Sequence, residues 1–213
     1  MSELRITEIF HSLQGESSLT GLPTVFVRLT GCPLRCVYCD TEYAFNGGTK
    51  TTIDDIIATI ESYDCPRVCV TGGEPLAQPE CITLLRQLCD SGFQVSLETS
   101  GAMDVSLVDP RVIKVMDLKT PDSGELARNR YDNIYSLTDQ DQVKFVIASK
   151  ADYDWATMQV AQYQLSDKVE VLFSPVYEKL QPAKLAQWIL KDRLEVRMQV
   201  QLHKVLWGET QGV

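Results

Sequence analysis

Short runs of β-branched and other apolar residues recur along this chain and alternate with segments of helical periodicity. Several runs are apolar throughout, as strands buried on both faces must be. This alternation is typical of repeated β–α units that build a mostly parallel sheet, so we expect an α/β fold. The expected strands are Ile6–Phe10, Val25–Thr30, Val68–Thr71, Val95–Glu98, Ile113–Asp117, Val143–Ile147, Val169–Phe173 and Val196–Gln201.

The helical segments are less evenly distributed than the strands. Thr52 can cap a helix whose isoleucines face inward, and Gly92 is a left-handed C-cap for another. Prolines and a glycine interrupt the pattern between Thr99 and Lys144, which predicts loop crossovers there. One expected helix starts near Thr52, and the other three span Gln78–Ser91, Ala151–Tyr163 and Pro182–Lys191.

The length and charge of the chain limit what it can be. Its 213 residues suit one domain, and 44% apolar with 23% charged residues is an ordinary globular composition. The chain has 29 Asp and Glu residues but only 20 Lys and Arg residues. Its net charge of -9 would repel the phosphates of a nucleic acid, so nucleic acid is an unfavourable partner. No apolar run is long enough to cross a membrane and no secretion signal opens the sequence, so we expect a cytoplasmic protein.

Three of the seven cysteines form a cluster directly after an expected strand, with the spacing Cys-x3-Cys-x2-Cys. They are Cys32, Cys36 and Cys39. An odd, clustered set favours a reducing compartment and a metal over disulfides. A structural zinc site needs a fourth ligand, yet His11 is distant in sequence and Cys65 and Cys69 follow a helix. Three thiolates on a cubane iron–sulfur cluster leave one iron open for another ligand.

The remaining cysteines lack the spacing of a second metal site. Cys65 and Cys69 are not followed by a third cysteine at metal-binding spacing, and Cys81 and Cys89 lie eight residues apart within an expected helix. We therefore expect small buried side chains at these positions. They are Cys65, Cys69, Cys81 and Cys89.

With Tyr38 just before the last cysteine, the triplet resembles the signature of the radical S-adenosylmethionine (SAM) superfamily. The resemblance implies a 4Fe-4S cluster whose open iron is chelated by the amino and carboxylate groups of SAM. It also implies that electron transfer cleaves SAM to a 5′-deoxyadenosyl radical, which the protein must keep from water and stray hydrogen donors. A zinc knuckle or an unrelated group of cysteines is the alternative interpretation.

A Gly-Gly-Glu sequence ends the expected strand at Val68–Thr71, where parallel α/β folds bind ligands. By itself it is equally typical of a tight turn. It resembles the radical SAM motif that binds the methionine amino group, and later strand ends add polar residues that can contact SAM or form turns. The SAM-binding candidates are Tyr38, Cys39, Asp40, Gly72, Gly73, Glu74, Ser100, Asp117, Leu118 and Lys119.

Further motifs resemble the 7-carboxy-7-deazaguanine synthase family along nearly the whole chain. They are Ile9–Glu16, Thr24–Cys32, Cys39–Thr41, Thr71–Pro75 and Gln199–Lys204. The resemblance implies a partial TIM-like barrel of about six parallel strands with fewer flanking helices around a radical SAM core. One domain, 1–213, is expected, with a substrate-binding segment 1–23, a core 24–180 and a C-terminal strand and tail 181–213.

The same resemblance implies ring contraction of 6-carboxy-5,6,7,8-tetrahydropterin to 7-carboxy-7-deazaguanine with loss of ammonia, in queuosine and 7-deazapurine biosynthesis. It implies Mg²⁺ near the Thr41 hydroxyl, a flavodoxin or ferredoxin as electron donor, and a homodimer. A pterin offers donors and acceptors that Gln14 and Glu16 can pair with, and Arg28 can bind its carboxylate. The substrate-binding candidates are Leu13, Gln14, Gly15, Glu16, Arg28, Thr71 and His203.

Other interpretations of these residues stay open on sequence alone. Glu16 can be a surface charge, Arg28 a member of a barrel ion pair, and His203 a structural histidine at the end of the last strand. The compact cysteine spacing also suits an activase that installs a glycyl radical in a partner protein. A non-catalytic iron–sulfur or zinc module is a third alternative, but it leaves the Gly-Gly-Glu sequence unexplained.

Overall fold

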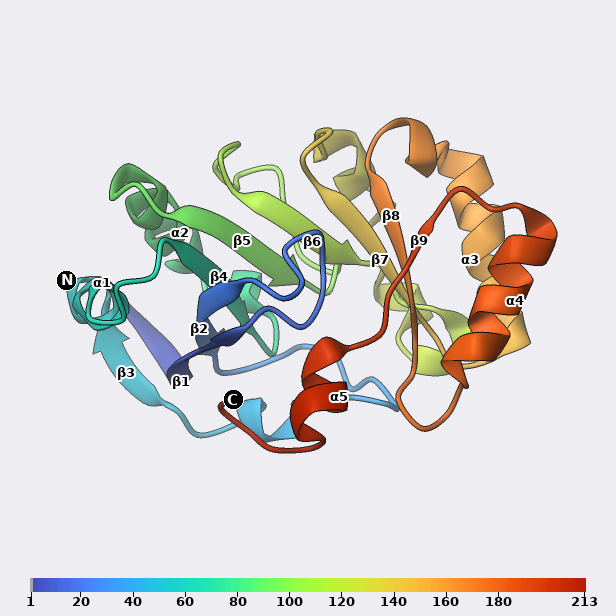
Figure 1. Ribbon diagram of the computed structural model, residues 1–213. Helices are drawn as coiled ribbons and strands as arrows, with labels where there is room; N and C mark the ends of the chain where they lie inside the picture. Colours follow the sequence, from blue (N-terminus) through green and yellow to red (C-terminus); the bar gives the residue numbers. More distant parts are fainter. Residues whose placement is uncertain (1) are drawn as a thin grey trace.

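The computed structural model describes residues 2–213, and the strands in this range form one nine-stranded sheet in the order β3-β1-β2-β4-β5-β6-β7-β8-β9 (Figure 1). β1 is antiparallel to β2 and β3, whereas each later pair along the sheet is parallel. The strands are β1 Glu3–Leu13, β2 Pro23–Leu29, β3 Thr49–Thr52, β4 Arg67–Gly72, β5 Gln94–Thr99, β6 Ile113–Asp117, β7 Gln142–Ile147, β8 Glu170–Pro175 and β9 Arg197–Met198. The prediction of a partial α/β barrel is confirmed.

Helices cover the two halves of the sheet unequally. α1 and α2 pack beside the first strands, and α3 and α4 pack beside β7 and β8, while α5 lies apart near the C-terminus (Figure 1). They are α1 Ile53–Glu61, α2 Cys81–Asp90, α3 Lys150–Tyr163, α4 Pro182–Asp192 and α5 Leu202–Trp207. Within residues 2–213, no helix has the length and apolar character needed to cross a membrane.

Local signals explain where α1 and α2 begin. The Thr52 hydroxyl accepts from the Asp55 amide, which confirms the predicted cap of α1. α2 begins at Cys81 and not at Gln78, because Gln78 precedes a proline and is extended. The Gln78 side chain instead pairs with the backbone of Arg5, holding the turn against β1.

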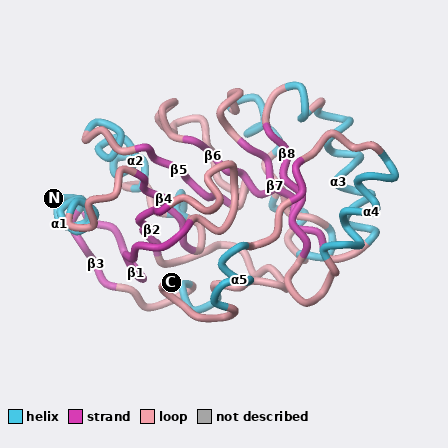
Figure 2. Tube along the Cα trace, in the orientation of Figure 1, coloured by secondary structure: helices cyan, strands magenta, loops and turns pink. Residues whose placement is uncertain are grey.

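Loops and short 3₁₀ turns connect β5, β6 and β7, as predicted from the interrupted pattern between Thr99 and Lys144 (Figure 2). The turns are Pro121–Ser123, Leu126–Arg128 and Tyr131–Ser136. Gly124 follows the first turn with a φ of 76°, a conformation that glycine adopts without strain. The sheet therefore lacks a long helix on this stretch, which leaves the barrel incomplete.

The C-terminal region differs from the prediction. The expected strand Val196–Gln201 contracts to the two residues of β9, because the chain leaves the sheet after the Gln199 amide donates to the Phe173 carbonyl. The next residues form α5, and Leu202 donates to the Gly15 carbonyl. His203 consequently lies on a helix that packs on the N-terminal segment, and its predicted place at a strand end was wrong.

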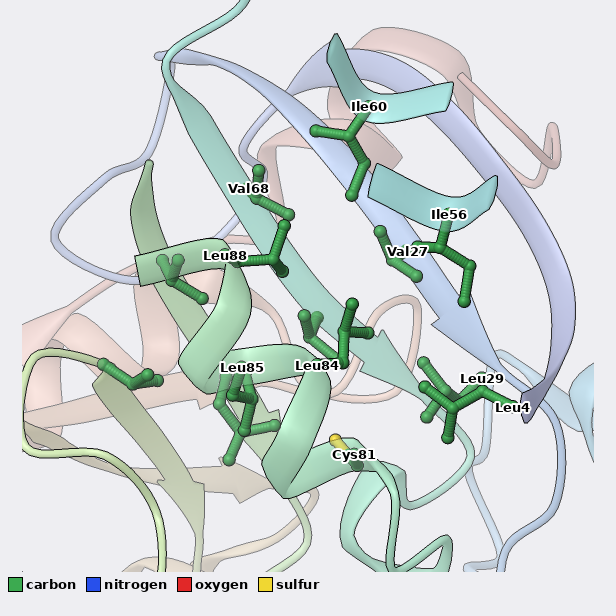
Figure 3. Close-up of a cluster of buried hydrophobic side chains, with 14 of the residues drawn as sticks. Leu4, Val27, Leu29, Ile56, Ile60, Val68, Cys81, Leu84, Leu85 and Leu88 are labelled. Carbon is green, nitrogen blue, oxygen red and sulfur yellow. The ribbon is translucent and has the colours of Figure 1, made fainter. Parts of the chain in front are cut away.

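A hydrophobic core lies between β1, β2, β4, β5 and the helices α1 and α2 (Figure 3). Leu84 and Leu88 of α2 face Val27 and Val68, and all four are fully buried or nearly so. Three of the cysteines outside the triplet are buried and the fourth packs against this core, which confirms their prediction as small apolar side chains. The core thus fixes the strands whose ends carry the polar motifs.

Replacing Leu84 by alanine is expected to lower the free energy of unfolding by about 2–5 kcal/mol, because it removes buried carbon atoms and leaves a cavity. Leu84 is 0% exposed, whereas Leu107 is 72% exposed, so Leu107→Ala is the matched control with an expected change of about 0.5 kcal/mol or less. Urea unfolding followed by circular dichroism measures both changes. Equal effects of the two variants contradict the assignment of Leu84 to the core.

Candidate active site

A cavity of about 520 Å³ opens at the carboxyl ends of the parallel strands. Four parts of the chain line it: the strand ends, the cysteine loop that follows β2, the segment 13–16, and the tail that follows α5. All but Glu74 and Leu118 of the residues singled out from the sequence line this cavity. Ligands in parallel α/β sheets bind at this end of the strands, which makes the cavity the candidate active site.

The three cysteines of the triplet lie half-buried in the wall of this cavity. Burial raises the pKa of Cys36 to about 11, while Lys119 lowers it and Asp117 raises it further. The free thiols are therefore protonated at neutral pH, and a cationic iron centre must displace their protons on binding. Among residues 2–213, no three His, Cys, Asp or Glu side chains meet closely enough to hold a single metal ion.

The Gly-Gly-Glu turn touches the cysteine loop through backbone atoms. A Cβ on Gly73 would lie 2.3 Å from the Gly31 carbonyl oxygen, so only glycine fits there. The Glu74 amide donates to the same carbonyl at 2.9 Å. This contact places the two motifs side by side at the ends of β2 and β4.

The Glu74 carboxylate points away from the cavity and is fully buried. Its oxygens accept from the Leu76 amide, from the Thr99 hydroxyl, and from the amide and hydroxyl of Ser100. All these donors are within the protein, so Glu74 positions Ser100 at the cavity edge. Its predicted contact with the SAM amino group stays a prediction, and the exposed edge of this motif consists of Gly72 and Gly73.

Polar residues at the end of β6 and just after it form another part of the cavity wall. The Lys119 ammonium lies 2.7 Å from Asp117 Oδ2, while Asp117 Oδ1 is buried without a hydrogen-bond partner in the part of the chain that is described. The Tyr38 hydroxyl lies 3.1 Å from that of Thr120. Leu118 is fully buried in the core behind them, so its side chain is not in the cavity.

The N-terminal segment brings Gln14 and Glu16 to the other end of the cavity, and both are buried. Glu16 Oε2 accepts from the Lys144 ammonium at 2.6 Å, and Lys144 lies 3.6 Å from Glu98. Glu16 Oε1 and Gln14 Nε2 have no partner within residues 2–213. The protein thus leaves one buried acceptor and one buried donor unsatisfied, and Glu16 is not a surface charge.

Burial and the Glu16 charge raise the pKa of Glu98, although Lys144 lowers it. Burial alone lowers the pKa of Lys144, but the two carboxylates raise it well above its usual value. The lysine therefore stays charged, and Glu98 holds a proton more readily than a solvent-exposed glutamate does. Lys144 is a residue of the site that the sequence analysis missed. The sequence does contain a signal for it, because a charged residue within an apolar strand requires a partner of opposite charge.

His203 of α5 packs directly on Gly15, where a Cβ would lie 2.0 Å from the His203 Nδ1 atom. Burial lowers the pKa of His203, although the nearby Glu16 and Asp40 raise it. The imidazole is therefore neutral at pH 7 and lines the cavity next to Gly15. Gly15 is needed at this position because no side chain fits under the ring.

The remaining predicted residues occupy the rim between the two ends. Thr41 donates to Asp40 Oδ1 at 2.7 Å, which places two oxygen ligands together after the last cysteine. Thr71 opposes Arg28 in the register of β4 and β2, and both line the cavity. Arg28 forms an ion pair with Glu8 at 2.7 Å, so the alternative of a barrel ion pair holds for one of its nitrogens.

Comparisons with known proteins agree with this arrangement. A model of the radical SAM superfamily matches residues 26–118. The chain is 47% identical to the 7-carboxy-7-deazaguanine synthase of Chlorobaculum tepidum, over 99% of this chain and 97% of the relative. It is 44% identical to that of Koribacter versatilis, over 99% and 100%. The crystal structure of QueE from Escherichia coli has the same fold, with a TM-score of 0.79, 22% identity, and 94% and 95% of the two chains covered.

Gly73→Ala is expected to prevent cluster assembly, because its Cβ collides with the backbone that carries Cys32. Gly92→Ala, after the end of α2, is the control for lost stability alone: nothing lies within 4 Å of its Cβ position, but its φ of 86° strains an alanine, so this variant is expected to lose stability and keep its iron. Iron content and visible absorbance after anaerobic reconstitution measure the effect, and unfolding temperature monitors the fold. Normal iron content in Gly73→Ala contradicts the proposed contact between the two motifs.

Proposed function

The chain belongs to the 7-carboxy-7-deazaguanine synthase family of radical SAM enzymes, and from this premise we propose that it converts 6-carboxy-5,6,7,8-tetrahydropterin to 7-carboxy-7-deazaguanine. The reaction contracts a ring with loss of ammonia, which makes the protein a carbon–nitrogen lyase of queuosine and 7-deazapurine biosynthesis. The cavity has two chemically different ends, one with thiols and glycines and one with an amide and a carboxylate. This division suits one cofactor and one heterocyclic substrate.

The unpartnered pair Gln14 Nε2 and Glu16 Oε1 is the observation that carries the choice of a pterin. The pyrimidine edge of a pterin presents a carbonyl oxygen beside a ring NH and an amino group. The amide nitrogen of Gln14 can donate to that carbonyl, and the Glu16 oxygen can accept from the NH groups. Because both atoms are buried, leaving them without a ligand costs free energy that a matching ligand recovers.

The thiol end of the cavity fits a 4Fe-4S cluster and SAM. Three cysteines supply soft ligands, and the glycines leave space for the methionine part of SAM beside them. When bound, the cluster and SAM supply the radical that abstracts hydrogen from substrate C6. Asp117 Oδ1, buried and unpartnered within residues 2–213, would accept from a hydroxyl of SAM, and Lys119 pairs with the other oxygen of Asp117.

Arg28 lies between the two ends and binds the substrate carboxylate. Its guanidinium is half-buried beside the rings of Phe10 and Tyr43, which exclude water from the ion pair. Lys144 donates to Oε2 of Glu16 and fixes this carboxylate, so that its other oxygen accepts from the pterin. Neutral His203 packs over Gly15 and closes this end of the cavity. These contacts fix the pterin ring before C6 meets the adenosyl group.

We propose that Mg²⁺ binds at the Thr41 hydroxyl with the substrate carboxylate as a further ligand. Thr41 and Asp40 offer adjacent oxygen atoms in the cavity wall, which suits a hard cation. Thr41 and Asp40 would hold the ion, and when bound it would supply positive charge that offsets the charge of the carboxylate. Asp40 positions the hydroxyl through its hydrogen bond with Thr41.

An external flavodoxin or ferredoxin reduces the cluster, and the enzyme acts as a cytoplasmic homodimer. The exposed side chain of Val37, between two of the cysteines, gives a donor a short path to the cluster. The cysteines outside the triplet are dispersed in or beside the core, so they supply no relay. A size measurement of the anaerobic protein tests the dimer.

The function is tested by anaerobic reconstitution with iron, sulfide, SAM, Mg²⁺ and a flavodoxin, followed by mass spectrometry of the pterin reaction. We expect 7-carboxy-7-deazaguanine and ammonia, with deuterium from substrate C6 recovered in the 5′ position of SAM. Stoichiometric 5′-deoxyadenosine counts against reuse of SAM. Turnover only with a glycyl-radical enzyme indicates an activase, and absence of SAM cleavage under strong reductant indicates a non-catalytic module.

Thr41→Ala is expected to lower turnover and to raise the Mg²⁺ concentration for half-maximal rate, because it removes a ligand of the ion. SAM affinity, measured by equilibrium dialysis, is expected to stay unchanged. Thr59→Ala is the matched control, since Thr59 is an exposed residue of α1 and is not among the residues that line the cavity. Equal loss of SAM binding and turnover in Thr41→Ala contradicts the magnesium assignment.

A further inference from the structure

The guanidinium of Arg28 uses only one of its nitrogens within the protein. Its Nε donates to Glu8 Oε1 at 2.7 Å, and its two terminal nitrogens donate to no atom of residues 2–213. The rings of Phe10 and Tyr43 lie 5.8 and 5.7 Å from its Cζ. Arg28 is therefore held from one edge, and its opposite edge is left for a ligand.

Glu8 reaches Arg28 because β1 contains an irregularity just before it. Ile6 pairs with Leu29, and regular antiparallel pairing would then place Glu8 opposite Val27, yet Glu8 pairs with Arg28. A shift of one residue moves a side chain to the other face of a strand. The bulge thus brings the carboxylate of Glu8 to the face of the sheet that Arg28 occupies.

Tyr43 holds the same carboxylate oxygen. Its hydroxyl donates to Glu8 Oε1 at 2.8 Å, and burial, together with Glu8, raises the pKa of Tyr43 to about 12 although Arg28 lowers it. Tyr43 therefore stays a donor throughout the physiological pH range. A Cβ on Gly212 would lie 3.3 Å from the second oxygen of Glu8, so the tail packs on it from the other side.

We propose that Glu8 is a positioning residue that makes the cavity selective for carboxylated pterins. With Nε occupied by Glu8, a substrate carboxylate can form a two-point contact only with the two terminal nitrogens of Arg28. The guanidinium is oriented before the substrate arrives, which reduces the ordering cost of binding. This inference rests on the proposed function, in which Arg28 binds the substrate carboxylate.

The test compares two unreactive probes, 6-carboxypterin and 6-methylpterin, titrated into the reconstituted enzyme with SAM. Glu8→Ala is expected to lower the affinity for 6-carboxypterin about tenfold or more, which is the loss that a charge-assisted hydrogen bond implies. Binding of 6-methylpterin is expected to stay within about twofold, because it makes no contact with Arg28. Glu8→Gln keeps an oxygen for Arg28 Nε but loses the charge, so an intermediate loss of about threefold is expected.

Two further variants make the outcomes distinguishable. Arg28→Ala is expected to abolish the preference for 6-carboxypterin. Glu3 lies on β1 as Glu8 does, and Glu3→Ala removes only an exposed ion pair with Lys50 of β3, so this variant is expected to preserve the preference. If Arg28→Ala keeps the preference, the role of Arg28 in the proposed function is wrong. If Arg28→Ala abolishes the preference but both Glu8 variants keep it, the positioning role is overturned.

A purely structural role for Glu8 predicts a different result. In that case Glu8→Ala lowers the affinities for both probes and for SAM together, and the unfolding temperature falls in parallel. That result also overturns the proposal. Should Glu8→Ala fail to fold, Glu8→Gln decides alone, because an unchanged ratio of the two probe affinities in that variant contradicts the selection mechanism.

Discussion

The contact between Gly73 and the Gly31 carbonyl is the constraint on which the cavity depends. It joins the turn after β4 to the loop after β2 through backbone atoms, with no side chain between them. Any residue larger than glycine at position 73 forces the cysteine loop away from the glycine turn. The neighbouring Glu74 extends the constraint to β5, because its buried carboxylate takes both donors of Ser100. Three successive parallel strands are thereby locked at the end where the cavity opens.

The sequence predicted most of this end because its signals are local. A strand, a loop and a glycine turn are each encoded within a few residues, so the positions of β2, β4 and β5 in the sequence followed from apolar runs. It could not predict that α5 replaces most of the last expected strand, since the contacts of Gly15 with Leu202 and His203 join opposite ends of the chain. The β1 bulge was equally invisible, because the apolar pattern does not reveal the register of two strands.

Charge explains why the substrate end needs residues from separate strands. Lys144 enters the buried strand β7, where an unpaired ammonium is too costly, and Glu16 approaches it to 2.6 Å from the N-terminal segment. Glu98 remains 3.6 Å away with a raised pKa, so one lysine stabilises mainly one carboxylate. Glu16 is thus fixed through one oxygen while the other has no partner among residues 2–213, and the proposed recognition of pterin NH groups rests on that second oxygen.

The two ends of the cavity therefore differ in how they can change. The cofactor end depends on backbone contacts and consecutive residues, so almost any substitution there disrupts the thiols and glycines together. The substrate end depends on single side chains such as Glu8, Arg28 and Lys144, which come from different strands and meet as ion pairs. A substitution at one of them alters the affinity for one chemical group of the substrate without moving the cysteine loop. In the proposed function, substrate selection is therefore set by Glu8 of β1, Arg28 of β2 and Lys144 of β7, whereas the ends of β2 and β4 hold the cysteine loop and the glycine turn.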